Sequence, residues 1–221
     1  SRLRLMQQGM PPGSPPMRPL GLFDRDVPSL WNVKIARPAE SWDVVGLFNF
    51  DPDPAARGVR FDALGLDAEA DYAVFEFWEE RFLGVCRSGF ELTLPAASSR
   101  VFAVRRVTGH PQLLGTDMHL LQGWHEVREV NWDPARGALA GVYRRMPGVS
   151  GKAFFLVPGG YAPKFDFPLS PASARLTHIE GPLWMQEVVF ADPEYRWSIP
   201  FEMPKPPAAR EPNLAPAGGA R

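Results

Sequence analysis

The residues best suited to chemistry lie close together in the second half of the chain, and they comprise two imidazoles and two carboxylates: Asp117, His119, His125 and Glu126. Such groups bind divalent metals, and a histidine can act as the general base of an enzyme. Their spacing matches no metal-binding motif, so we interpret them as hydrogen-bonded groups of a loop. A weak metal site, or a small independent enzyme that uses His119 or His125, is kept as a lesser alternative.

Motifs for a catalytic nucleophile are incomplete. Residues 148–152 read Gly-Val-Ser-Gly-Lys, which begins like the nucleophile elbow of hydrolases but has lysine where the turn requires glycine. The sole cysteine, Cys86, lies in a strand-like stretch, so we interpret its thiol as a small buried apolar group. The paired carboxylates of glycoside hydrolases are defined by their separation in space, which a sequence does not provide. We therefore assign no catalytic residue and no cofactor to this chain.

The seven tryptophans raise the possibility of ligand binding. An exposed indole face stacks on the apolar face of a sugar ring, whereas most tryptophans of a β-protein fill its core. Trp124 and Trp132 flank a polar, strand-like stretch. They are therefore our candidates for exposed residues that bind carbohydrate.

Composition argues against several classes of partner. The chain has 221 residues, with 24 basic and 25 acidic side chains and a formal net charge of -1. This balance gives no overall field that would attract nucleic acid or an anionic membrane, so we expect neither partner. One cysteine permits neither an intrachain disulfide nor a cysteine-cluster zinc site. No Asn-X-Ser/Thr acceptor occurs, which slightly favours a cytoplasmic location but leaves the compartment unknown.

Strands are the elements that must position these residues. The 25 prolines favour strands and turns over long helices. The predicted strands share either alternation with a period of two or a β-prone aromatic composition: 42–50, 72–78, 90–94, 100–107, 124–132, 138–145, 152–157, 173–180, 184–190 and 195–199. The only helical candidate is 22–30, and Pro28 limits it.

This pattern predicts an all-β fold built from two consecutive antiparallel β-sandwich-like subdomains. The first subdomain spans residues 21–108 and the second spans residues 109–203. Residues 1–20 are rich in proline and are predicted to form a flexible linker. Residues 204–221 lack aromatic side chains and are predicted to be a disordered tail.

Several stretches resemble one enzyme family. Residues 19–31, Pro-Leu-Gly-Leu-Phe-Asp-Arg-Asp-Val-Pro-Ser-Leu-Trp, resemble the segment that leaves the catalytic barrel in α-galactosidase-like glycoside hydrolases, the family 36 type and its relatives. Other stretches are similar to that family's C-terminal β-sandwich region: 42–49, 72–84 and 110–123. The resemblance covers roughly residues 19–160 and continues more weakly to residue 200.

The resemblance implies a supporting role. Such enzymes hold both catalytic aspartates in a (β/α)₈ barrel, which takes about 200 residues or more. This chain has no room for a barrel, so none of its residues inherits a catalytic role, and the glycosidase would be the parent enzyme. The implied partner is the missing barrel of the same parent chain, docked on an apolar patch: Leu22, Phe23, Leu30 and Trp31.

Two departures and two alternatives accompany this interpretation. The proline-rich residues 11–16 and the loop at residues 51–57 have no counterpart in the family. One alternative is a carbohydrate-binding module that uses exposed tryptophans, and the other is a plain structural or protein-interaction domain.

Overall fold

The structure, a computed structural model, describes residues 15–23, 26–38, 40–164 and 174–204. Every regular element in these residues is a β-strand, and the strand pairs are antiparallel, which confirms the predicted all-β fold. The described part of the chain contains no helix that could cross a membrane. The predicted flexible ends fall mostly on residues 1–14 and 205–221, which lie outside the described residues.

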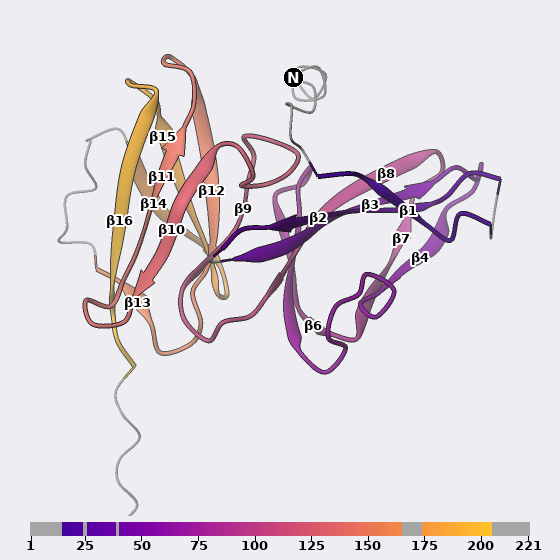
Figure 1. Ribbon diagram of the computed structural model, residues 1–221, viewed down its shortest axis with the longest axis horizontal. Helices are drawn as coiled ribbons and strands as arrows, with labels where there is room; N and C mark the ends of the chain where they lie inside the picture. The colour runs from indigo at the N-terminus through magenta and orange to yellow at the C-terminus, as the bar shows by residue number, and fades with distance from the viewer. Residues whose placement is uncertain (1–14, 24–25, 39, 165–173, 205–221) are drawn as a thin grey trace, which may run out of the picture.

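The first half of the chain forms a six-stranded sheet covered on one face by a strand pair (Figure 1). In spatial order the sheet contains β1 (Arg18–Leu20), β2 (Leu30–Ala36), β3 (Ser41–Asn49), β8 (Ser98–Arg106), β5 (Asp71–Glu76) and β6 (Arg81–Arg87). The covering pair consists of β4 (Ala55–Arg60) and β7 (Gly89–Leu94). Between them lies an apolar core that includes Val45, Phe61, Val74 and Phe102.

The second half forms a sandwich of two four-stranded sheets, at the left in Figure 1. One sheet has the order β10 (Val127–Asp133), β11 (Ala138–Arg144), β16 (Glu194–Glu202) and β13 (Ala162–Pro163). The other has the order β14 (Ala174–Glu180), β15 (Leu183–Val189), β12 (Ser150–Leu156) and β9 (Gln112–Thr116). Aromatic side chains fill the space between them, among them Tyr143, Phe155 and Trp197.

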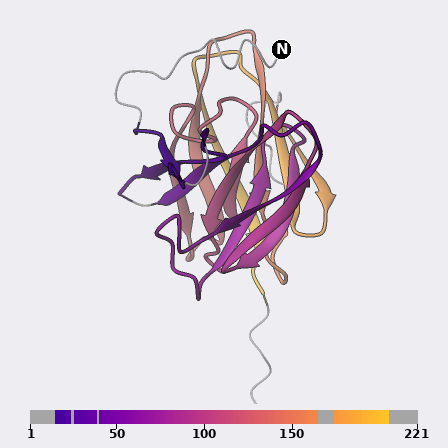
Figure 2. The same ribbon diagram turned by 90° about the vertical axis from the view of Figure 1, so that its right-hand side faces the viewer.

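The two sandwiches pack directly against each other, and in Figure 2 the first lies in front of the second. Phe75 of β5 contacts Phe154 of β12, with ring centroids 4.6 Å apart, in a shared apolar cluster. A second cluster places Leu121 on the strand residues Ile35 and Trp42. Sheets of both halves therefore form a stack in which the six-stranded sheet is buried on both faces over part of its area.

Strand β3 illustrates why the alternation pattern was informative. Val45 and Leu47 face the core of the first sandwich, whereas Trp42 and Val44 face the second half of the chain. All four side chains are buried, so this strand has apolar neighbours on both of its faces.

Two expectations for the start of the chain were wrong. The described residues of the stretch considered for a helix, 22–30, form turns and bends and then enter β2 at Leu30. The linker predicted over residues 1–20 overlaps β1, because Leu20 pairs with Leu30 and both contact the first core. Burial of these two leucines accounts for an ordered edge strand in a proline-rich stretch.

Candidate functional site: a cleft between the two sandwiches

A cleft of about 690 Å³ lies at the junction of the two sandwiches. This volume is within the usual range of small-molecule sites, about 300–1,000 Å³, and domain interfaces are common places for them. One wall comes from the first sandwich and includes Arg37, Glu40 and Ser41. The opposite wall comes from the second sandwich and includes Val130, Trp132 and Leu139.

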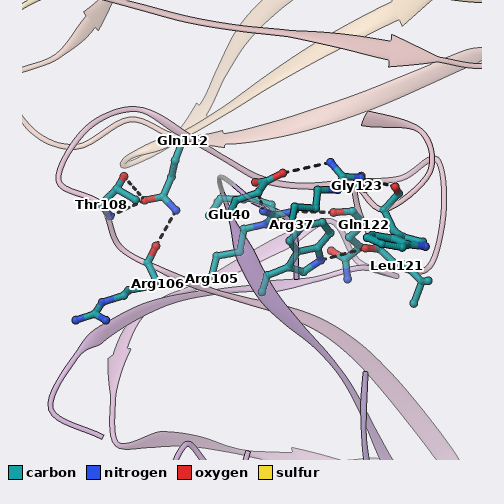
Figure 3. Close-up of polar contacts among 12 residues, drawn as sticks. Arg37, Glu40, Arg105, Arg106, Thr108, Gln112, Leu121, Gln122 and Gly123 are labelled. Atoms are coloured by element: carbon teal, nitrogen blue, oxygen red, sulfur yellow. Dashed lines mark hydrogen bonds and ion pairs between the residues drawn. The ribbon is translucent and has the colours of Figure 1, made fainter. Parts of the chain in front are cut away.

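Two arginines and one glutamate organise the polar wall (Figure 3). Glu40 accepts a hydrogen bond from Arg37 at 3.3 Å through one oxygen and from Arg105 at 3.0 Å through the other. The carboxylate is thereby fixed by two cations from β8 and from the end of β2. Charge-assisted hydrogen bonds of this kind hold side chains in one geometry.

Both arginines also bind the loop that follows β9, and Arg105 binds β9 itself. Arg105 donates to the carbonyl oxygens of Leu114 at 2.8 Å and Gln122 at 2.9 Å, and Arg37 donates to those of Gly123 and Trp124. The loop can approach because residue 123 is glycine: its φ is 122°, and a Cβ there would lie 3.0 Å from Nη2 of Arg105. The arginines therefore join the two halves of the chain.

Burial of these arginines disfavours their charged forms. Desolvation lowers the pKa of Arg105 and of Arg37, and the charge of Glu40 opposes that shift in both. Only 4% of the Arg105 side chain is exposed, against 17% for Arg37 and 22% for Glu40. Arg105 is thus a structural link, whereas Arg37 and Glu40 reach solvent in the cleft.

The connector between β8 and β9 is held by its own hydrogen bonds. Oε1 of Gln112 accepts from the backbone N–H and the hydroxyl of Thr108, both at 2.9 Å. Nε2 of Gln112 donates to the carbonyl oxygen of Arg106 at 3.0 Å (Figure 3). These bonds fix the chain that lines the cleft between its two walls.

Trp132 and His110 form the aromatic part of the cleft. Their rings are parallel within 6° with centroids 5.2 Å apart, and both residues line the cleft. Tyr161 contacts the indole edge-on at a centroid distance of 5.6 Å. The indole is therefore half-buried and held in place, and His110 covers part of it.

The two tryptophans proposed to bind sugar have different environments. Trp132 lines the cleft, whereas Trp124 packs beside the apolar cluster of Trp42 and Leu121. The guanidinium of Arg37 lies over the Trp124 ring, 5.4 Å from its centroid. Trp124 thus has the contacts of a packing residue, and Trp132 is the one placed beside a ligand-sized space.

Three of the four polar residues singled out from the sequence, His119, His125 and Glu126, line a smaller pocket of about 230 Å³, and Asp117 is not part of its lining. The two imidazole rings meet edge to face with centroids 5.4 Å apart. Burial lowers the pKa of both histidines. Within the described residues, no group of three or more His, Cys, Asp or Glu side chains could hold a metal ion.

Hydrogen bonds account for the acidic members of this group. Asp117 accepts the backbone N–H of Lys152 at 2.7 Å, and burial raises the pKa of its carboxyl group. Glu126 accepts the hydroxyl of Thr116 at 2.5 Å and the backbone N–H of Gly123 at 2.6 Å. Both carboxylates therefore stabilise the loop between β9 and β10.

The four residues expected to dock a barrel fall into two classes. Leu22 and Phe23 are exposed, the latter by 97%. Leu30 packs against the first core, and Trp31 is half-buried with its indole N–H donated to the carbonyl oxygen of Pro28 at 3.0 Å. Only the loop residues thus present an apolar surface to solvent.

Other residues discussed from the sequence also have structural surroundings. Cys86 lies in β6 beside the first core, and burial raises the pKa of its thiol, which disfavours the thiolate. Ser150 begins β12, so the motif at residues 148–152 leads into a strand and lacks the helix of a nucleophile elbow.

Sequence reasoning missed Arg37, Glu40, Arg105 and His110. One signal was available, because Arg105 directly follows the apolar run Val101–Val104 and shares a face with Ala103. A charge at such a position requires a buried partner. Nothing in the sequence identifies that partner, since Glu40 lies 65 positions away from it.

Comparisons with known proteins add no assignment: no protein-family model matches this sequence, and no curated protein is significantly similar to it.

Proposed function

We propose that this chain is a non-catalytic β-sandwich region of an α-galactosidase-like glycoside hydrolase, and that it packs against the catalytic barrel of its parent enzyme. The observation that carries the proposal is a set of exposed apolar side chains at one end of the first sandwich. They belong to the β1–β2 loop and the end of β3: Leu22, Phe23, Val27 and Phe50. Their exposed fractions are 51%, 97%, 51% and 54%.

The exposed side chains adjoin an aromatic row on the six-stranded sheet. Phe48 and Phe50 stack with centroids 5.5 Å apart, and Trp31 lies beside Phe48 across the side-chain-free Gly46. The β1–β2 loop is bonded to this row, because the backbone N–H of Phe48 donates to the carbonyl oxygen of Ser29 at 2.8 Å. An apolar patch with a polar surround is typical of an interaction site.

The place of this patch favours a barrel as its occupant. Three of its four side chains, those of Leu22, Phe23 and Val27, lie in the segment that resembles the exit from the catalytic barrel, residues 19–31. Figure 1 shows the β1–β2 loop at the end of the molecule away from the second sandwich. Burial of one phenylalanine side chain contributes about 1.5–3 kcal/mol. Several such side chains would therefore anchor a neighbouring domain.

The intact mass of the gene product in its source cell tests this proposal. We expect a product well above 24.6 kDa that contains this sequence after a barrel-sized segment. Top-down mass spectrometry would give both the mass and the position of the sequence. A native product of 24.6 kDa would contradict the proposal, because the same chain would then contain no barrel for the patch to contact.

A further inference from the structure

We infer that the cleft between the two sandwiches binds the ring of a neutral sugar. This inference does not depend on the proposed docking to a barrel, because the cleft and the exposed apolar patch share no residue. The argument starts from the chemical difference between the two walls of the cleft.

One wall is apolar and the other is polar. Leu113, Val130 and Leu139 line the cleft together with the Trp132–His110 ring pair. Facing them are Arg37, Glu40 and Ser41. A pyranose has an apolar C–H surface and a rim of hydroxyl groups, so it matches both walls at once.

The polar wall has hydrogen-bonding capacity to spare. Within the described residues, Arg37 donates only through its two Nη atoms, which leaves its Nε–H free. Each oxygen of Glu40 accepts one side-chain hydrogen bond, although a carboxylate offers about four acceptor sites. A hydroxyl group can donate to Glu40 while it accepts from Arg37, because a hydroxyl has both functions.

Charge balance favours a neutral ligand. Arg37 and Glu40 form an ion pair with each other at 3.3 Å, and Arg106, an exposed arginine of the lining, pairs with Asp67 at 3.6 Å, so each accessible charge of the cleft has a partner. The additional cation, Arg105, is buried, and backbone carbonyls and Glu40 occupy its donors. A charged sugar would lose hydration on entry without gaining a free counter-charge.

Trp132 provides a reporter for the site. The residue lines the cleft and its ring stacks on His110, so a ligand there would change the surroundings of its indole N–H. The indole N–H of Trp42, in contrast, is bonded to the carbonyl oxygen of Leu121 at 3.1 Å. A sugar in the cleft should therefore shift the Trp132 resonance and leave that of Trp42 unchanged.

The experiment is a titration of the ¹⁵N-labelled full chain, followed through the tryptophan indole N–H signals. The probes are glucose, galactose and mannose, their trisaccharides, and glucuronate and galacturonate as charged analogues. The signal of Trp132 is assigned with Trp132→Phe. We expect one or more neutral sugars to shift it with a dissociation constant of about 1–10 mM, a weak affinity suited to a partly solvated cleft.

A blocking variant and a matched control make the test specific. Ser41→Trp places a bulky side chain in the cleft from an exposed position and should weaken binding by about tenfold or more. Ser150→Trp makes the same change at an exposed serine of β12 outside the cleft and should leave binding unchanged. Circular dichroism spectra establish that both variants fold.

Three results would overturn the inference. One is the absence of any shift with all neutral probes at about 50 mM, well above the expected dissociation constant. A second is an unchanged dissociation constant in Ser41→Trp, which would place the binding site elsewhere. The third is tighter binding of the uronates than of the neutral sugars, which would make the cleft an anion site.

Discussion

The outer face of the six-stranded sheet has a covered end and an uncovered end, and the two differ in chemistry. At the covered end, Trp42, Arg105 and Phe75 contact the second half of the chain. At the uncovered end, Phe48 and Phe50 continue the same strand and the same face into solvent. The covered end contains polar groups whose partners come from another part of the chain, and the uncovered end contains mainly aromatic rings.

The polar groups explain why the second sandwich sits in one place. Apolar side chains alone would allow it to slide along the sheet, since burial of apolar area has no direction. Arg37 and Arg105 instead require carbonyl oxygens of β9 and of the loop that follows it at fixed distances. The aromatic rings described at the uncovered end impose no such hydrogen-bond geometry, which suits a surface that packs against another domain.

The largest effect should follow removal of Arg105. We expect Arg105→Met to lower the free energy of unfolding by about 3–5 kcal/mol, because it leaves two buried carbonyl oxygens without a donor and Glu40 with Arg37 as its only cation among the described residues. Arg81→Met, which removes an exposed arginine paired with Glu79 at 3.9 Å, should cost less than about 1 kcal/mol. Urea unfolding curves measure both. Equal losses in the two variants would contradict the structural role of Arg105.

A matched pair of tryptophans sharpens the comparison between the two ends. Trp42 and Trp31 share one face of the sheet, and each donates its indole N–H to a carbonyl oxygen. Only Trp42 is fully buried, and Arg105 lies 4.0 Å from the centroid of its ring. We expect Trp42→Phe to cost about 2–3 kcal/mol and Trp31→Phe about 0.5–1 kcal/mol. A larger loss for Trp31 in thermal or urea unfolding would reverse our account of which end is packed.

These contrasts also show what a sequence can reveal about this fold. Alternating apolar residues identified most strands, including β3, β8 and β16, since the period of two marks a half-buried or fully buried strand directly. One missed strand, β2, has that signal, since Trp31, Val33 and Ile35 alternate with polar residues. Two other missed strands lack it. β4 reads Ala-Ala-Arg-Gly-Val-Arg with little apolar content, and β9 is five residues long and buried throughout.

The cleft was harder to predict than the strands. Its walls come from residues around positions 40, 108 and 132, and only the packing of two sandwiches brings them together. Trp132 was identified because aromatic residues beside a polar strand are conspicuous. Arg37 and Glu40 were not, because each is an ordinary polar residue until the loop of the second half is placed against it.

A smaller effect should appear with pH at the His119–His125 pair. Burial lowers both folded-state pKa values below that of an unfolded histidine, about 6.5, so the unfolded chain binds more protons in mild acid. The stability from neutral imidazoles is therefore complete above about pH 6.5 and declines as the pH falls through that value. Urea midpoints between pH 7.5 and 5.5 should decrease. This window lies above the usual titration of carboxyl groups, near pH 4.

Substitution of the pair provides the control for this pH dependence. In His119→Asn with His125→Gln, the decline between pH 7.5 and 5.5 should become shallower. Asparagine keeps an acceptor for the Leu121 N–H that His119 accepts at 3.1 Å. His178→Gln changes an exposed histidine of β14 and should retain the full decline. An unchanged pH dependence in the double variant would assign the effect to other groups.

The smallest effect on stability belongs to the uncovered end. Phe23→Asp should change the free energy of unfolding by less than about 0.5 kcal/mol, because Phe23 is 97% exposed. It should nevertheless reduce the fluorescence of a hydrophobic dye bound to this chain, since the dye reports on exposed apolar patches. Met146→Asp, at a position of the second half that is 78% exposed and outside this patch, should reduce it far less. If Phe23→Asp destabilises the isolated chain by several kcal/mol, this side chain packs within the chain and is unavailable to a neighbouring domain.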